Sequence, residues 1–322
     1  MQKLFKAAVV AVISSLALAG CSPTVDNKTV VLVTHDSFAI SKELQKQFET
    51  ESGFRLKLVK AGDAGSMTNK LVLTKDQPIG DAVFGIDNTL TEVASENQLI
   101  DGELSAIDFG DVCMNYDIDW FASRSKTVPT NIRDLTSSKF RNLTVVSNPA
   151  TSSSGMAFLA TTIDVFGEDD YLGYWSQLKS NGLKVVAGWE DAYFTEFSGS
   201  SGHGKYPIVL SYSSSPAFEI RDDGKSQTAS ILRDCYRQTE FAGVLSKAKN
   251  PVGAKALVEF MKAEAFQAAL PESMYVYPVD QGIALPETWA KFAPAALTLA
   301  GEELDVTGNR KTWLSAWSKL FE

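Results

Sequence analysis

The sequence predicts an exported α/β protein with two lobes. Three observations support this: an N-terminal stretch typical of export, a length beyond one ordinary core, and a repeated order of strand, loop and helix. Removing residues 1–21 from the 322-residue chain leaves 301, which is long for a single compact core and suits two. The repeated order is typical of largely parallel sheets flanked by helices.

The first 21 residues have the pattern of a signal peptide. Lys3 and Lys6 supply positive charge, and the apolar run 7–19 is too short to span a bilayer but long enough for export. The run ends in Leu-Ala-Gly-Cys, which resembles the bacterial lipobox, so we expect Cys21 to become a lipid-bearing N-terminus. Residues 22–28 would be a tether that holds the protein on the outer side of the cytoplasmic membrane, or in the periplasm. Secretion without lipid is the alternative.

The charge balance disfavours polyanionic partners. Without the signal peptide the chain has 28 Lys and Arg against 39 Asp and Glu, a formal balance of −11. A chain this acidic repels nucleic acid and anionic lipid, so we expect no nucleic-acid partner and no membrane contact beyond the anchor. A cationic ligand is favoured, although an acidic surface is also common among soluble proteins.

Two cysteines remain after Cys21, and both lie in segments that look extended. Cys113 and Cys235 could form a disulfide between neighbouring strands, as exported proteins often do, or stay as two buried thiols. The chain has two histidines, His35 and His203, and no close Cys and His spacing. We therefore expect no metal site.

Five predicted strands are each followed by a loop and a predicted helix. The pairs are 30–33 before 40–51, 54–59 before 66–74, 82–86 before 89–97, 143–146 before 155–166, and 183–187 before 191–197. In such folds ligands bind where the strands end and the helices begin. The loops after the strands are therefore the segments to search for a site.

The segment Gly199–Lys205 matches the spacing of a phosphate-binding loop, but its context does not fit. Tyr206 stands where Ser or Thr would hold magnesium, and residues 206–210 read as a turn into a strand rather than a helix. No nucleophile elbow is present, and Ser246-Lys247-Ala248-Lys249 lacks the partner motifs of a serine acyl enzyme. An exported hydrolase is therefore the alternative, and a non-catalytic binding protein the preferred interpretation.

Hydroxyl and aromatic residues gather after the predicted strands. Ser152 and Ser153 precede a helix, and Tyr212-Ser213-Ser214-Ser215 follows a strand. Such hydroxyls either cap helices or bind oxygen atoms of a ligand. Trp189 follows a strand and Gly188, with Glu190, Asp191 and Tyr193 close behind. Aromatic faces and acidic groups together suit a flat organic cation.

Several motifs along nearly the whole mature chain resemble those of the thiamine-binding proteins of bacterial ABC importers, within the two-lobed periplasmic-type solute-binding proteins. The motifs are T-H-D-S-F at 34–38, G-D-A-G-S-M-T-N-K-L at 62–71, A-V-F-G-I-D-N-T-L at 82–90, N-P-A-T-S-S-S-G at 148–155, G-W-E-D-A-Y at 188–193, L-S-Y-S-S-S-P-A-F at 210–218 and Y-V-Y-P-V at 275–279. The combination of D-S-F, G-x-D-N and S-Y-x-x-S-P is what makes the resemblance specific.

The resemblance implies a ligand site as well as a family. By position, Asp63 and Ala64 match an Asp-Gly ligand loop, Ser152 and Ser153 a hydroxyl pair, Trp189 a stacking ring, and Tyr212 to Ser215 a binding loop. The chain departs from the family at three of these positions: Ala64 replaces Gly, Tyr275 replaces a cleft Trp, and His35 replaces a Tyr. It also lacks the Trp that follows D-S-F in the family.

The implied fold is a type II two-lobed binding protein, each lobe a mixed sheet flanked by helices. Lobe 1 would hold 29–113 and 238–322, lobe 2 would hold 114–237, and the segments near Cys113 and Cys235 would be the two hinge strands.

The implied function is capture of thiamine or its phosphate esters between the lobes, for delivery to a membrane permease with a separate ATPase. We expect a monomer without cofactor. Asp63 is the preferred acid for the ligand charge, with Asp36 and Asp87 as turn or cap residues. A polyamine is the alternative cargo, because acid and aromatic groups suit it too.

Overall fold

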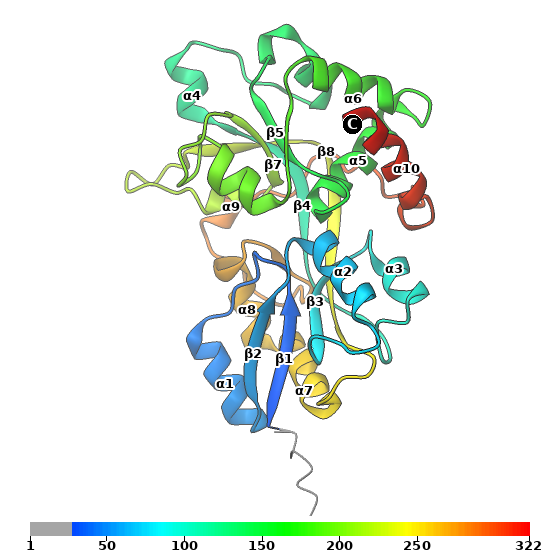
Figure 1. The fold of residues 1–322 in the computed structure, drawn as a ribbon. Helices are drawn as coiled ribbons and strands as arrows, with labels where there is room; N and C mark the ends of the chain where they lie inside the picture. Colours follow the sequence, from blue (N-terminus) through cyan, green and yellow to red (C-terminus); the bar gives the residue numbers. More distant parts are fainter. Residues whose placement is uncertain (1–27) are drawn as a thin grey trace, which may run out of the picture.

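The computed structural model describes residues 28–322, and Figure 1 shows them arranged as two lobes, one above the other. The predicted signal peptide, the lipid site at Cys21 and most of the predicted tether lie outside the described residues. Within residues 28–322, no helix combines the length and the apolar character needed to cross a bilayer.

Among the described residues, nine strands form one mixed sheet that runs through both lobes. Eight lie in the order β2-β1-β3-β8-β4-β7-β5-β6, and β9 pairs with β4. Their bounds are β1 Thr29–Thr34, β2 Arg55–Lys60, β3 Ala82–Asp87, β4 Ser105–Asp117, β5 Thr144–Ser147, β6 Lys184–Val186, β7 Ile208–Tyr212, β8 Thr228–Val244 and β9 Tyr277–Pro278. β1 is parallel to β2 and β3, and β5 is parallel to β6 and β7, so each lobe has a parallel part.

The helices pack against the two halves of this sheet. The α-helices are α1 Lys42–Ser52, α2 Ala64–Leu73, α3 Thr91–Glu96, α4 Ile118–Ser123, α5 Ser153–Phe166, α6 Tyr171–Ser180, α7 Pro251–Lys262, α8 Glu264–Ser273, α9 Trp289–Phe292 and α10 Val306–Phe321. Short 3₁₀ segments are η1 Ile132–Thr136, η2 Ser138–Phe140 and η4 Ser215–Ala217, and η3 Asp191–Glu196 is a π-helix.

Local sequence signals explain where several helices start and stop. Ser41 caps α1 by accepting a hydrogen bond from the Leu44 amide, and Gly53 ends the helix in the left-handed conformation. Asp63 caps α2, which therefore begins at Ala64, two residues before the predicted start. The predicted helix at 191–197 is present as the π-helix η3, an element that is frequent at functional sites.

Each lobe has its own apolar core. In lobe 1, buried side chains of β1, β3 and α7, among them Leu32, Phe84 and Leu257, form one cluster. In lobe 2, Trp175 of α6 is fully buried and makes edge contacts with Phe158 of α5. Burial of a large aromatic side chain contributes on the order of 2–3 kcal/mol, so these clusters hold each lobe together independently.

Helix α10 corrects one predicted lobe assignment. Residues 238–322 were all assigned to lobe 1, but Trp313 and Trp317 of α10 belong to the lobe 2 core, where Trp317 makes an edge contact with Trp175. Figure 1 shows this helix beside α5 and α6. The apolar face of α10 packs on α6 in this buried cluster, and no sequence signal states which lobe a terminal helix covers. The boundaries near 113 and 237 remain a prediction.

Three segments of the described chain cross between the lobes, one more than predicted. The long strands β4 and β8 both run through the two lobes, as expected for hinge strands (Figure 1). A third segment runs beside β8, where the Leu297 amide donates to Leu232 O at 2.7 Å and the Ala300 amide to Cys235 O at 2.7 Å. This third segment carries the chain to α10 on lobe 2.

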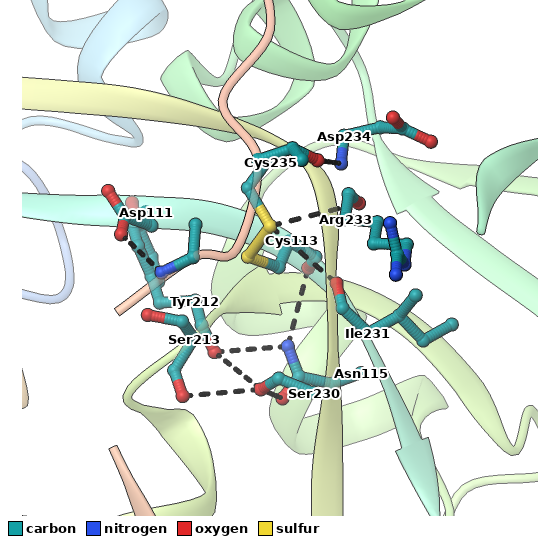
Figure 2. Close-up of a disulfide and its surroundings, with 12 residues drawn as sticks. Asp111, Cys113, Asn115, Tyr212, Ser213, Ser230, Ile231, Arg233, Asp234 and Cys235 are labelled. Atoms are coloured by element: carbon teal, nitrogen blue, oxygen red, sulfur yellow. Dashed lines mark hydrogen bonds between the residues drawn. A yellow bond between two sulfur atoms is a disulfide. The ribbon is translucent and has the colours of Figure 1, made fainter. Parts of the chain in front are cut away.

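A disulfide joins the two hinge strands. Cys113 of β4 and Cys235 of β8 are bonded across 122 positions of sequence, with Cα atoms 4.7 Å apart. Figure 2 shows the Asn115 amide beside the bond, donating to Cys113 O and Tyr212 O. The disulfide that the sequence allowed is therefore present between the two strands that connect the lobes.

Candidate functional site

A cleft between the lobes collects most of the predicted site residues. Its empty volume, including the open mouth, is about 840 Å³. The lining residues are His35, Ser37, Asp63, Ser153, Ser154, Trp189, Glu190, Tyr193, Phe194, Tyr212, Ser215, Phe218, Glu240, Ser273, Met274, Tyr275 and Val276.

One wall of the cleft is aromatic and comes from lobe 2. Trp189, just before η3, stacks on Tyr193 with ring centroids 5.0 Å apart and planes at 15°. Its indole N–H donates to Ser211 Oγ at 2.9 Å, which fixes the ring orientation. Tyr212, at the end of β7, meets Trp189 at a steep angle, with centroids 6.1 Å apart. Two ring faces therefore border one space.

The facing aromatic group comes from lobe 1. Tyr275 follows α8 and has φ of 57°, a left-handed conformation that is unusual for tyrosine. Its carbonyl accepts a hydrogen bond from the Ser214 hydroxyl of lobe 2, and its ring makes an edge contact with Phe218. Strained backbone at a cleft is typical of functional sites, and here the interlobe hydrogen bond holds it.

Asp63 lines the cleft, but its carboxylate is engaged by backbone amides. One oxygen accepts from Ala64 N at 2.6 Å, as the α2 cap, and from Ser153 N at 3.4 Å, and the other accepts from Trp189 N at 2.8 Å. Burial raises the pKa of Asp63, while the bond from Trp189 and a hydroxyl contact with Ser152 oppose that shift. Asp63 thus links lobe 1 to lobe 2.

The predicted hydroxyl residues divide into two groups. Ser153 and Ser215 line the cleft, whereas Ser152, Ser213 and Ser214 are buried beside it. The Ser152 hydroxyl bonds to that of Ser154 at 3.1 Å, and Ser154 bonds to Ser147 at 2.8 Å. Ala64 is also buried and does not line the cleft. These residues support the cleft wall from behind.

The acidic group that faces the cleft from lobe 1 is Glu240 of β8. Its carboxylate lies 3.2 Å from His35 Nε2, and both side chains are about nine-tenths buried, with 8% and 10% of their surface exposed. Asp108 of β4 lies directly opposite Glu240 in the strand register and is fully buried. Among the described residues that line the cleft, none is Lys or Arg.

The sequence missed Glu240 and several smaller contributors, including Ser154, Phe194 and Phe218. Glu240 stands in a mostly apolar strand, T-E-F-A-G-V, and a charged residue in such a strand was the only available signal. Asp36 and Asp87 do what was expected of turn residues: their carboxylates accept from Gly62 N at 3.0 Å and Thr89 N at 2.6 Å. Neither lines the cleft.

Known proteins share this two-lobed fold. A family model described as bacterial extracellular solute-binding protein matches residues 79–294. The chain belongs to this family. This solute-binding protein has its cleft between two lobes that share hinge strands, and small-molecule sites are frequent at such interfaces.

Two relatives of this solute-binding protein cover nearly all of it. It is 30% identical to the thiamine-binding periplasmic protein of Escherichia coli (strain K12) over 319 residues, which is 93% of this chain and 95% of that one. It is 26% identical over 330 residues to the thiamine-binding periplasmic protein of Brucella suis biovar 1 (strain 1330), covering 94% and 96%.

Solved structures agree on the fold. A periplasmic thiamin binding protein superimposes with a TM-score of 0.80 at 26% identity, covering 91% of this solute-binding protein and 96% of that chain. Iron-bound HitA from Pseudomonas aeruginosa has a TM-score of 0.71 at 16% identity, covering 91% and 99%. The second likeness concerns the fold alone.

Proposed function

We propose that this solute-binding protein captures thiamine between its lobes for import by an ABC transporter. The observation that carries the proposal is the convergence of Trp189, Tyr212 and Tyr275 on one interlobe cleft that is also lined by the carboxylate of Glu240. Thiamine is a flat organic cation, and it needs ring faces for stacking and a negative charge nearby. The relatives whose names include thiamine binding support the same ligand.

Each part of thiamine has matching groups in the cleft. Trp189 and Tyr212 offer faces to the aminopyrimidine and thiazolium rings. Ser153 and Ser215 offer hydroxyls to the hydroxyethyl end, or to a phosphate on it. Asp63 was the preferred acid, but its oxygens already accept three backbone hydrogen bonds, so Glu240 is the better partner for the positive charge.

Calorimetry with the purified mature chain tests this proposal. We expect saturable, one-to-one binding of thiamine and much weaker binding of spermidine, because a flexible polyamine gains little from stacking. Thiamine monophosphate and diphosphate belong in the same series, since they determine whether a cleft without lining Lys or Arg accepts added negative charge. Tighter binding of spermidine than of thiamine would contradict the proposal.

A matched pair of tryptophan variants tests the role of the aromatic wall. Trp189→Ala is expected to weaken thiamine binding by about 1–3 kcal/mol through lost stacking. Trp120→Ala, in the short helix α4 outside the cleft, is expected to leave the affinity unchanged. Equal affinities for both variants would remove Trp189 from the ligand site.

The proposal extends to how the protein works in the cell. It acts without catalysis and as a monomer, anchored through lipid on Cys21, and its closed form docks on a permease with a separate ATPase. Cys21→Ser is expected to release the protein from the membrane fraction without changing thiamine affinity. Thiamine recovered unaltered after long incubation with the protein would support the absence of hydrolysis.

A further inference from the structure

His35 and Glu240 lie side by side, almost wholly buried, in the wall of a cleft proposed to receive a cation. His35 follows β1 and Glu240 lies in β8, so the pair joins two segments that are far apart in the sequence. The distance of 3.2 Å between Nε2 and the carboxylate oxygen leaves no room for a second group between them. Both side chains nevertheless line the cleft and can be reached from it.

The surrounding backbone is shaped to seat the His35 ring. Gly85 of β3 has φ of 101°, and a Cβ atom there would lie 2.3 Å from His35 Cδ2. The register between β3 and β8 shifts at this point, between Phe84 and Ile86. The centroid of the Phe84 ring lies 5.5 Å from that of the His35 ring. The imidazole is therefore held in place, with Nε2 3.2 Å from the carboxylate of Glu240.

Asp108 limits the charge that the adjacent pair of carboxyl groups carries. Asp108 and Glu240 face each other across β4 and β8, where two negative charges would repel. Burial, with the charge of Glu240 added to it, raises the pKa of Asp108 well above its usual range. The two adjacent carboxyl groups therefore favour a single negative charge, and Glu240 is the member of the pair that lines the cleft.

The groups around His35 favour its protonated form while the cleft is empty. Burial lowers the pKa of His35, but the charge and close approach of Glu240, with smaller contributions from Asp63 and Asp36, outweigh burial and raise it overall. Glu190, across the cleft, and Asp108, behind Glu240, are the other acidic groups nearby. None of the described residues lining the cleft is Lys or Arg, so no cationic side chain there opposes the proton.

We propose that Glu240 is the counter-ion of the bound organic cation, and that His35 occupies this role with its proton in the empty cleft and releases that proton to solvent when the cation binds. The proposal rests on the proposed function and refines it. Two positive charges beside one buried carboxylate repel each other strongly, because the interior screens charge poorly. The arriving cation therefore displaces the proton, and His35 remains as a neutral imidazole.

Proton release makes binding sensitive to acid in a defined direction. Where His35 is protonated in the free protein, each bound cation must displace up to one proton, so the Kd rises up to about tenfold for each unit fall in pH. Where His35 is already neutral, the Kd is flat. A neutral ligand of the same shape displaces no proton and shows no such slope.

Calorimetry in buffers of different ionisation enthalpy measures the proton count directly. Thiamine and its neutral thiophene isostere are titrated into the full mature protein from about pH 8.5 to about pH 6, a range in which imidazole changes charge and the ligand's aminopyrimidine does not. We expect thiamine to release a fraction of a proton that grows as pH falls, and the isostere to release none.

The two histidines of the chain provide a matched control. His203 lies on an exposed loop away from the cleft, so His203→Gln is expected to keep the proton release of the parent. His35→Gln keeps a neutral donor beside Glu240 but cannot titrate, so its Kd is expected to lose the pH slope. Histidine NMR of the parent provides a second readout: the His35 resonance is expected to shift to its neutral position on binding, and that of His203 to stay.

Removing the negative charge of Glu240 distinguishes the contribution of charge to binding from that of stacking. Glu240→Gln is expected to weaken thiamine binding roughly 30-fold or more and to abolish proton release, while the neutral isostere loses far less. Thiamine binding with no proton release in the parent, or an unchanged slope in His35→Gln, would overturn this inference and leave the proposed function standing. No thiamine binding at any pH would overturn the proposed function, and this inference with it.

Discussion

The carboxylate of Asp63 in lobe 1 accepts a hydrogen bond of 2.8 Å from the backbone amide of Trp189 in lobe 2. It accepts a second interlobe bond, of 3.4 Å, from the amide of Ser153. Close by, the Ser66 amide donates to Thr151 O at 3.0 Å. The N-terminus of α2 is thus fastened to the opposite lobe.

Asp63→Asn is expected to weaken ligand binding by opening this contact. Asparagine still caps α2, but its amide group would face the N–H of Trp189 or Ser153 and leave a buried donor unpaired. The expected loss is about 1–3 kcal/mol of binding free energy, measured by calorimetry. Small-angle scattering with saturating thiamine is expected to show a more open particle. Asp117→Asn, at a helix cap inside lobe 2, is the control and should change neither quantity.

Gly85→Ala is expected to disturb the cleft, whereas Gly102→Ala is not. Both glycines have positive φ, 101° and 95°, so alanine is strained at each and costs about 1 kcal/mol of stability. A Cβ at Gly85 also collides with the His35 ring, whereas one at Gly102 meets nothing within 4 Å. Thermal unfolding should show a loss for both variants, larger for Gly85→Ala because of the collision, and calorimetry should show weakened thiamine binding for Gly85→Ala alone. Equal thiamine affinities for the two variants would mean that binding does not depend on the position of the His35 ring.

Loss of the disulfide is expected to destabilise the protein without abolishing the site. Cys113 and Cys235 close a loop of 122 positions, for which the chain-entropy effect is on the order of 5 kcal/mol, and less where the unfolded state is compact. Urea unfolding of the Cys113→Ser, Cys235→Ser variant should give a lower midpoint than the oxidised parent. A reducing agent should lower the parent to the same midpoint and leave the variant unaffected. An unchanged urea midpoint for the parent in the reducing agent would contradict a stabilising disulfide.

Asp87 is expected to make folding stability depend on pH. Burial raises its pKa to about 6 despite the hydrogen bonds from Thr89. The native state therefore holds this proton more tightly than the unfolded state. The resulting contribution of Asp87 to the free energy of unfolding is fully present below about pH 4 and is lost as pH rises through about 6. The change amounts to about 3 kcal/mol at most.

The measurement is the free energy of unfolding in urea between about pH 4 and pH 7, the range bracketing these two pKa values. Position 87 cannot titrate in Asp87→Asn. The difference in free energy of unfolding between parent and variant is therefore expected to change across this range and to favour the variant at neutral pH. Asp101→Asn, at an exposed position, serves as control and should run parallel to the parent. Parallel curves for Asp87→Asn would contradict the assignment.

Local sequence patterns determined most of the secondary structure and several site residues. Strand and helix periodicities at 30–59 and 143–166 were confirmed within two residues at most ends, because caps and turn residues act over a few positions. Trp189 and Tyr212 were identifiable because aromatic residues after strands are locally conspicuous, whereas Tyr275 was identified only by its match to a family position. The three side chains do share a cleft.

Only the tertiary structure decided which acid faces the cleft and which lobe α10 covers. The sequence favoured Asp63, but folding surrounds Asp63 with amides of lobe 2 and brings Glu240 beside His35. Helix α10 reaches lobe 2 because a third crossing runs along β8. These outcomes depend on strand register and packing between residues far apart in the chain, and neither periodicity nor composition records such contacts.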